Sequence, residues 1–133
     1  MEFDQEKLLD ALRSKNVKVD DTIKRFVGNS ALFVKFIISF AFEDRLPAIY
    51  EAYDSGDNDK LIMVVHKLKG VGGNLGMTDI YETAEKAIAI LRSGSRDGVL
   101  DLLKQLEARC KDISETVKNN IPEGLDPEKD ITV

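Results

Sequence analysis

Apolar residues recur at helical spacing along almost the whole chain, and the apolar–polar alternation typical of strands is nearly absent. Short turn signals interrupt this spacing, and Gly and Pro are otherwise sparse. The pattern therefore predicts an all-α protein. Helices are expected at about 4–15, 20–27, 30–53, 59–75, 78–92 and 96–119, with Pro47 either kinking the third helix or starting a new segment.

The turns between the four long segments are short, so consecutive long helices are expected to lie antiparallel. We predict an up-down four-helix bundle, with the two short N-terminal helices covering one end. The bundle is expected over residues 1–120, and a flexible tail over 121–133, where two prolines and a glycine occur. The position of Met1 directly before the first helix favours a stand-alone chain.

Composition narrows the class of protein. The 133 residues are enough for one domain, and the net charge of −5 argues against a nucleic-acid binder. Cys110 is the single cysteine, which excludes an intrachain disulfide and a cysteine-based metal site. The acidic N-terminus is unlike a signal peptide, and the most apolar stretch, 31–42, is too short to span a bilayer. We expect a cytoplasmic monomer with no membrane partner.

The segment 59–76 contains His66, the only histidine, and a cluster of glycines. At about 100° per residue, one side of this predicted helix is apolar and should face the core. His66 is predicted to point almost directly away from that side. The residues expected on the core face are Leu61, Val64, Leu68, Val71 and Leu75.

The glycines of this helix are unusual, because each costs ~1 kcal/mol relative to alanine in a helix interior. Gly72 lies on the flank, where it could let a neighbouring helix pack closely. Gly70 and Gly73 are expected to face outward beside His66, where no intramolecular packing is predicted. A missing side chain there would leave room for another molecule to approach the imidazole.

Two apolar residues, Ile62 and Met63, are predicted on the same outward side of the helix. Exposed apolar groups beside a reactive side chain suggest a docking patch. The alternative is that they pack under a loop or under the N-terminal helices.

An exposed neutral imidazole is a good nucleophile and exchanges a proton near neutral pH. If His66 attacks a phosphoryl group, Lys69, one turn away, can supply positive charge to the phosphoryl oxygens. With one histidine and no Ser-His-Asp set, the sequence argues against a hydrolase. The glycine run also fails the G-x-G-x-x-G nucleotide pattern, because Leu75 occupies the third glycine position. No metal site is predicted.

The run His66-Lys67-Leu68-Lys69-Gly70, followed by small residues and by Asn74-Leu75-Gly76, resembles the signature of histidine-containing phosphotransfer (HPt) domains. Val71 is larger than the residue usual at its position. The segments 26–42, 46–47 and 54–57 are also similar to the family, so the resemblance covers roughly residues 5–118.

The resemblance implies a phosphorelay intermediate without independent catalytic turnover. His66 would accept a phosphoryl group from a receiver-domain aspartate and pass it to another receiver, with Lys69 holding the phosphate and Gly70 leaving room. The expected partners are response-regulator receiver domains and a hybrid sensor histidine kinase. The chain itself would carry no cofactor, and Mg²⁺ would come from the receiver.

Further site residues follow from the resemblance. Many members carry Gln or Glu twenty-two residues after the histidine, where it hydrogen-bonds the imidazole; here that position is Ile88. Glu85, one turn earlier, is a candidate substitute. Asn74 in the motif and the basic Arg92 are candidate binding residues.

Two alternatives stand beside this hypothesis. The first is a receiver-binding adaptor of the same fold that carries no phosphate, which the intact His66, Lys69 and Gly70 argue against. The second is a purely structural bundle, which leaves the outward glycines unexplained.

Overall fold

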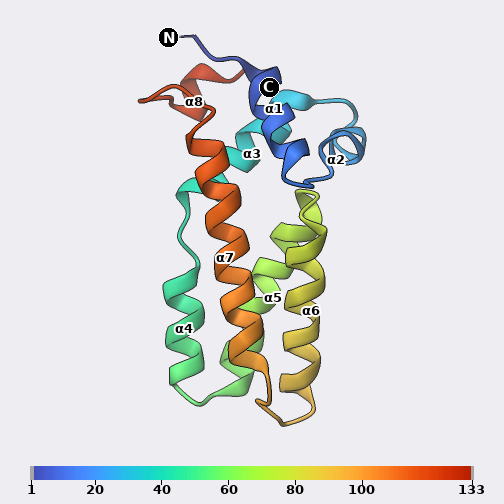
Figure 1. Ribbon diagram of the computed structural model, residues 1–133, viewed down its shortest axis with the longest axis vertical. Coiled ribbons are helices and arrows are strands. Elements are labelled where there is room, and N and C mark those ends of the chain that lie inside the picture. The colour runs from blue at the N-terminus through green and yellow to red at the C-terminus, as the bar shows by residue number, and fades with distance from the viewer. Residues whose placement is uncertain (1, 133) are drawn as a thin grey trace.

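The structure is a computed structural model that describes residues 2–132, and over that range it contains helices and no strands. Figure 1 shows their arrangement. In chain order the helices are α1 (Gln5–Ser14), α2 (Val19–Arg25), α3 (Ser30–Phe42), α4 (Leu46–Asp54), α5 (Asn58–Asn74), α6 (Thr78–Arg92), α7 (Val99–Lys118) and α8 (Pro127–Asp130).

Side-chain caps fix where α1, α3 and α5 begin. An Asp or Asn side chain accepts a hydrogen bond from a backbone N–H in the first turn, which satisfies a donor that has no partner within the helix. These bonds are Lys7 N to Asp4 Oδ1 at 3.1 Å, Leu32 N to Asn29 Oδ1 at 3.0 Å and Lys60 N to Asp57 Oδ1 at 3.1 Å.

Helices α4, α5, α6 and α7 run alongside one another as an up-down bundle joined by short turns (Figure 1). Helix α5 packs against both α4 and α6, and α6 packs against α7. Helices α1, α2, α3 and α8 gather at one end of the bundle, and we call them the end cap (Figure 1). The predicted all-α bundle, covered at one end by short N-terminal helices, is confirmed.

The predicted helix 30–53 is two helices. Glu43 ends α3 in an extended conformation (φ −99°, ψ 113°), and α4 begins at Leu46 with Pro47 in its first turn. Proline is tolerated there because that N–H would have no helical partner. Of the two alternatives for Pro47, the new segment is therefore the one found. As a result α3 belongs to the end cap, where it packs on α7, and α4 completes the bundle.

One apolar core runs through the bundle and into the end cap. Its large, fully buried side chains include Phe33 and Ile37 of α3, Leu61 and Leu68 of α5 and Leu103 of α7. Full burial of one such side chain contributes about 1.5–3 kcal/mol. Burial along α5 therefore offsets the cost of its three internal glycines.

The C-terminal segment packs against α3 within the end cap. Ile131 is buried, α8 contacts α3, and Lys35 Nζ is 2.9 Å from Glu128 Oε2. The predicted flexibility of residues 121–133 concerns motion and stays a prediction; Val133 lies outside the described residues.

Within residues 2–132 no single helix is long and apolar enough to cross a bilayer. Only α2 and α3 taken together meet the length and composition criteria, and they are bent by 116° at the break between them.

Candidate functional site

His66 lies in the middle of α5, and its side chain is exposed. Among residues 2–132 no hydrogen bond or ion pair to its imidazole is found. The helix around it is regular, begins at the Asp57 cap and continues to Asn74. The ring is therefore held by the helix backbone alone and is open to an incoming group.

The buried face of α5 differs from the predicted one. Leu61 and Leu68 are buried as expected, but the other buried positions are Val65 and Gly72, whereas Val64 and Val71 are only half-buried. The buried face is thus rotated by roughly 50° about the helix axis, at 100° per residue. Leu75 is also buried, as predicted, and Val64 and Val71 pack against the edge of the core rather than within it, because α6 covers the side that carries Gly72. His66 nevertheless remains on the exposed side.

Gly70 and Gly73 have different surroundings. A Cβ atom added at Gly70 would have no neighbour within 4 Å, so this position opens onto solvent one turn from His66. At Gly73 the same atom would lie 3.1 Å from Cδ2 of Tyr81. The prediction that no intramolecular packing occurs at Gly73 was wrong, because the Tyr81 ring of α6 lies against it.

Gly72 lies where α5 packs closely on α6. A Cβ atom there would lie 2.9 Å from Cγ2 of Ile80 and 3.2 Å from the Tyr81 backbone nitrogen. The expectation that Gly72 lets a neighbouring helix pack closely agrees with this geometry.

Lys69 lies one turn beyond His66, and its side chain is only 19% exposed. Its Nζ is 4.0 Å from Oε1 of Glu85 and 5.0 Å from the centre of the Tyr81 ring. Both contacts belong to α6, so the ammonium group is held between the two helices. Glu85 is half exposed, so its attraction for Lys69 is screened by water.

Ile88 does not face the imidazole. Its side chain is 2% exposed and belongs to the core of α6. The position where many family members carry a polar partner for the histidine is therefore apolar and turned inward. Glu85, the candidate substitute, is paired with Lys69 instead.

The remaining predicted residues are spread along α5 and α6. Met63 is 58% exposed, whereas Ile62 is half-buried and packs against the core. Asn74 is exposed and borders a groove between α5 and α3, whose other lining residues include Phe26, Phe36 and Val71. Arg92 is exposed in the last turn of α6.

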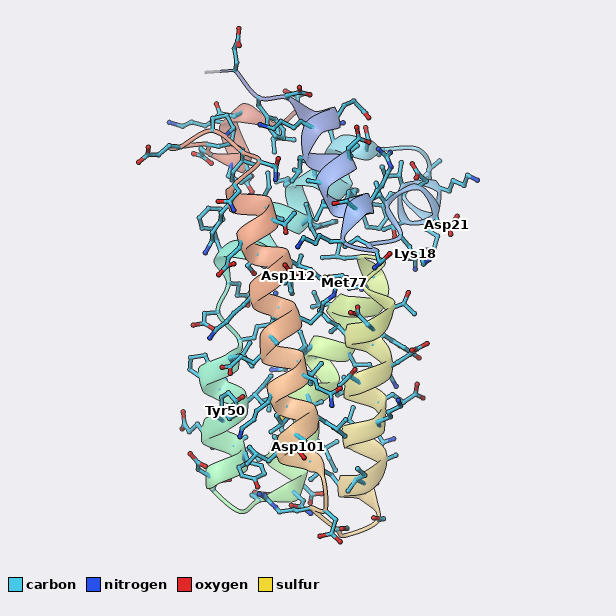
Figure 2. The ribbon with its side chains drawn as sticks, viewed as in Figure 1. Lys18, Asp21, Tyr50, Met77, Asp101 and Asp112 are labelled. Atoms are coloured by element: carbon cyan, nitrogen blue, oxygen red, sulfur yellow. The ribbon has the colours of Figure 1, made fainter. Side chains whose placement is uncertain are left out.

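Lys18 and Arg25, at the two ends of α2, bond the end of α5 and the turn that follows it, which sequence reasoning missed. Arg25 Nη2 donates a hydrogen bond of 3.1 Å to the carbonyl of Gly73, and the Lys18 N–H donates one of 2.9 Å to the carbonyl of Gly76. Figure 2 shows Lys18 at the start of α2, beside Met77, which precedes α6. The last carbonyls of a helix lack partners within it, and a cation there is favourable.

No group of three or more His, Cys, Asp or Glu side chains that could hold a metal ion occurs in the described part of the chain. The geometry instead brings together an exposed imidazole, an open glycine and a lysine one turn away. This arrangement suits reversible attachment of a group that another molecule presents.

Comparison with known families decides the identity. The family model for the Hpt domain matches residues 41–116, which is more than half of the chain and includes α4, α5, α6 and most of α7. The chain belongs to the Hpt domain family. Hpt domains are phosphocarrier modules of two-component signalling, and they interact with receiver domains of response regulators and with kinases. Searches of curated proteins and of solved structures gave no significant match.

The matched region of this Hpt domain is shorter than the predicted extent of 5–118. It begins at Ala41, close to the break between α3 and α4, and ends within α7. Most of the end cap therefore lies outside the region matched by the family pattern. The residues that hold α5 from α2, Lys18 and Arg25, are among those outside it.

Proposed function

We propose that this Hpt domain is a phosphorelay intermediate: His66 accepts a phosphoryl group from the aspartate of one receiver domain and passes it to another. The observation that carries the proposal is the open space at Gly70, one turn from an exposed His66. A helix interior disfavours glycine, so clearance for a second protein explains its presence.

Phosphoryl transfer to His66 exchanges a P–O bond for a P–N bond. The neutral imidazole attacks the phosphorus of the aspartyl phosphate, the P–N bond forms and the P–O bond to the aspartate breaks. The aspartate leaves as a carboxylate, and the imidazole N–H proton is released. The reverse sequence at a second receiver frees His66 again, so the domain carries the group without net turnover.

Lys69, one turn from His66, is the cation that would supply charge to the phosphoryl oxygens. Its Nζ is held by only a screened carboxylate and a ring face, so a phosphoryl group that carries more negative charge can compete for it. The Mg²⁺ that such a transfer uses would be bound by the receiver. Donor and acceptor receivers, one of them belonging to a hybrid sensor histidine kinase, are the proposed partners.

The test is direct transfer. The protein is mixed with a receiver domain phosphorylated on its aspartate, with Mg²⁺, and acid-labile, base-stable phosphate on the Hpt chain is measured. We expect label on the wild type and none on His66→Gln. An unlabelled wild type that still binds the receiver would favour the phosphate-free adaptor, and label that survives His66→Gln would identify a different residue.

A second variant tests the role of Gly70. Gly70→Gln should fold, because nothing lies within 4 Å of the added Cβ, but it should slow transfer by occupying the approach to His66. Ala108→Gln is the matched control, because it adds the same polar side chain at an exposed helical position of a different helix, α7. Equal transfer rates for Gly70→Gln and wild type would contradict the clearance role of Gly70.

A further inference from the structure

Tyr81 connects the glycine run of α5 to the lysine beside the histidine. It lies in the first turns of α6, with one edge of its ring against Gly73 and its face toward Lys69. The distance from Cδ2 to a Cβ at position 73 would be 3.1 Å, which is tighter than ordinary van der Waals contact. A residue larger than glycine would therefore push the ring away from its present position.

Lys69 depends on that ring for its location. A lysine side chain has four rotatable carbons and is normally free to sample many conformers in water. Here Nζ is 5.0 Å from the Tyr81 ring centre, within the distance at which a cation is attracted to an aromatic face. Glu85, one helical turn beyond Tyr81, adds the second contact at 4.0 Å.

We propose that Tyr81 is a positioning residue for Lys69, and that Gly73 is a glycine because the ring needs its space. The inference rests on the proposed function and adds the residue that positions the positive charge of Lys69. The ring face has no carboxylate, so it can hold the ammonium on the α6 side of α5 without neutralising it. Glu85 is the counter-charge that a phosphoryl group on His66 displaces.

The placement is tested first without phosphate. An aromatic face shifts the resonances of nearby protons, so the Lys69 Hε signals should lie upfield of ordinary lysines in a proton NMR spectrum. We expect Tyr81→Phe to keep this shift and Tyr81→Leu to abolish it. Gly73→Ala should reduce it, whereas Gly70→Ala should leave it unchanged, because no side chain lies near that position.

The consequence for transfer is tested with a phosphorylated receiver and Mg²⁺. Tyr81→Leu should slow labelling of His66 by about two- to five-fold, the range that an exposed cation–π contact supports. Tyr81→Phe, which retains the ring, should transfer at the wild-type rate. In a Lys69→Ala background, Tyr81→Leu should cause no further slowing, because its effect acts through Lys69.

Two results would overturn the inference. One is slowing by Tyr81→Leu that persists undiminished in the Lys69→Ala background, which would mean that the ring serves the fold or contacts the receiver. The other is a Lys69 Hε shift that does not depend on the ring. If the wild type takes no phosphate while the Hε shift behaves as expected, the proposed function has failed, and the transfer role of Tyr81 fails with it.

Discussion

Gly72 and Ile80 are in direct contact where α5 packs on α6: a Cβ atom at position 72 would lie 2.9 Å from Ile80 Cγ2. The contact sets how closely the two helices approach. It also sets the rotation of α5, because the glycine side of the helix is the one that α6 covers.

The first prediction compares two glycines of the same helix. Gly72→Ala should lower the free energy of unfolding by about 1–3 kcal/mol, because the added methyl group overpacks the α5–α6 interface. Gly70→Ala should instead raise it by up to ~1 kcal/mol, because alanine favours the helix and the position is open. Urea denaturation followed by circular dichroism measures both. Equal effects at the two positions would contradict the difference in packing.

The second prediction concerns the turn between α5 and α6. Gly76 has φ +76°, and a Cβ there would meet Thr22 Oγ1 and lie 2.8 Å from the carbonyl oxygen of Lys18. Gly94 has a similar φ of +86° but open surroundings. Gly94→Ala should therefore lower the free energy of unfolding by about 1–2 kcal/mol, the cost of placing alanine in the left-handed conformation. Gly76→Ala should lower the free energy of unfolding by clearly more in the same denaturation experiment, since α2 must also move.

The third prediction concerns the reactivity of Cys110, which is 6% exposed in α7. Burial raises the pKa of its thiol to about 11. The thiolate is the reactive form, so alkylation should be very slow at pH 8 and accelerate on unfolding. Labelling with iodoacetamide, followed by mass spectrometry with and without urea, measures this. Rapid labelling of the folded protein would show that the thiol is accessible.

The fourth prediction concerns pH and Asp112 in α7. The hydrogen bond from Lys15 Nζ, 2.9 Å from Oδ1, lowers the pKa of Asp112 below its ordinary 3.8, and the nearby Arg109 contributes in the same direction. A carboxyl group whose pKa is lowered by folding stabilises the protein above its unfolded pKa, and this stability is lost as pH falls through the folded pKa.

Asp112→Asn should therefore lower the free energy of unfolding at pH 7 by up to ~1 kcal/mol, the scale of a partly exposed ion pair. The difference from wild type should shrink as the pH falls below about 4. Urea denaturation at a series of pH values measures it, with Glu115→Gln, an exposed carboxylate of the same helix, as control. A difference that stays constant across this range would assign the effect to something other than charge.

The sequence was sufficient to predict α1, α2, α5, α6 and α7 and their order, because apolar spacing and turn residues mark them directly. It left the division between α3 and α4 open and did not predict α8. It could not predict the rotation of α5. Helical projections weight side chains by hydrophobicity, and glycine has no side chain to weight. Gly72 nevertheless lies on the buried face, because α6 fits against its backbone. Val64 and Val71 therefore lie at the edge of the core and are only half-buried.

The candidate site was predicted in part. The exposure of His66 and the open surroundings of Gly70 follow from periodicity and agree with the structure. The contacts of Lys69 with Tyr81 and Glu85 could not be predicted, because they depend on the register between two helices. The support of α5 from Arg25 could not be predicted either, since 48 residues separate Arg25 from Gly73.

That support has an evolutionary consequence. The helix that carries His66 lies inside the region that matches the Hpt family, but its last turn is bonded by Arg25 and the turn after it by Lys18, both of which lie outside that region. Substitutions in the N-terminal helices are therefore not neutral for the shared module, because those helices contact the end of the helix that carries His66, and the turn after it, through two backbone carbonyls. A graft of residues 41–116 onto another protein would inherit the signature and lose this anchor.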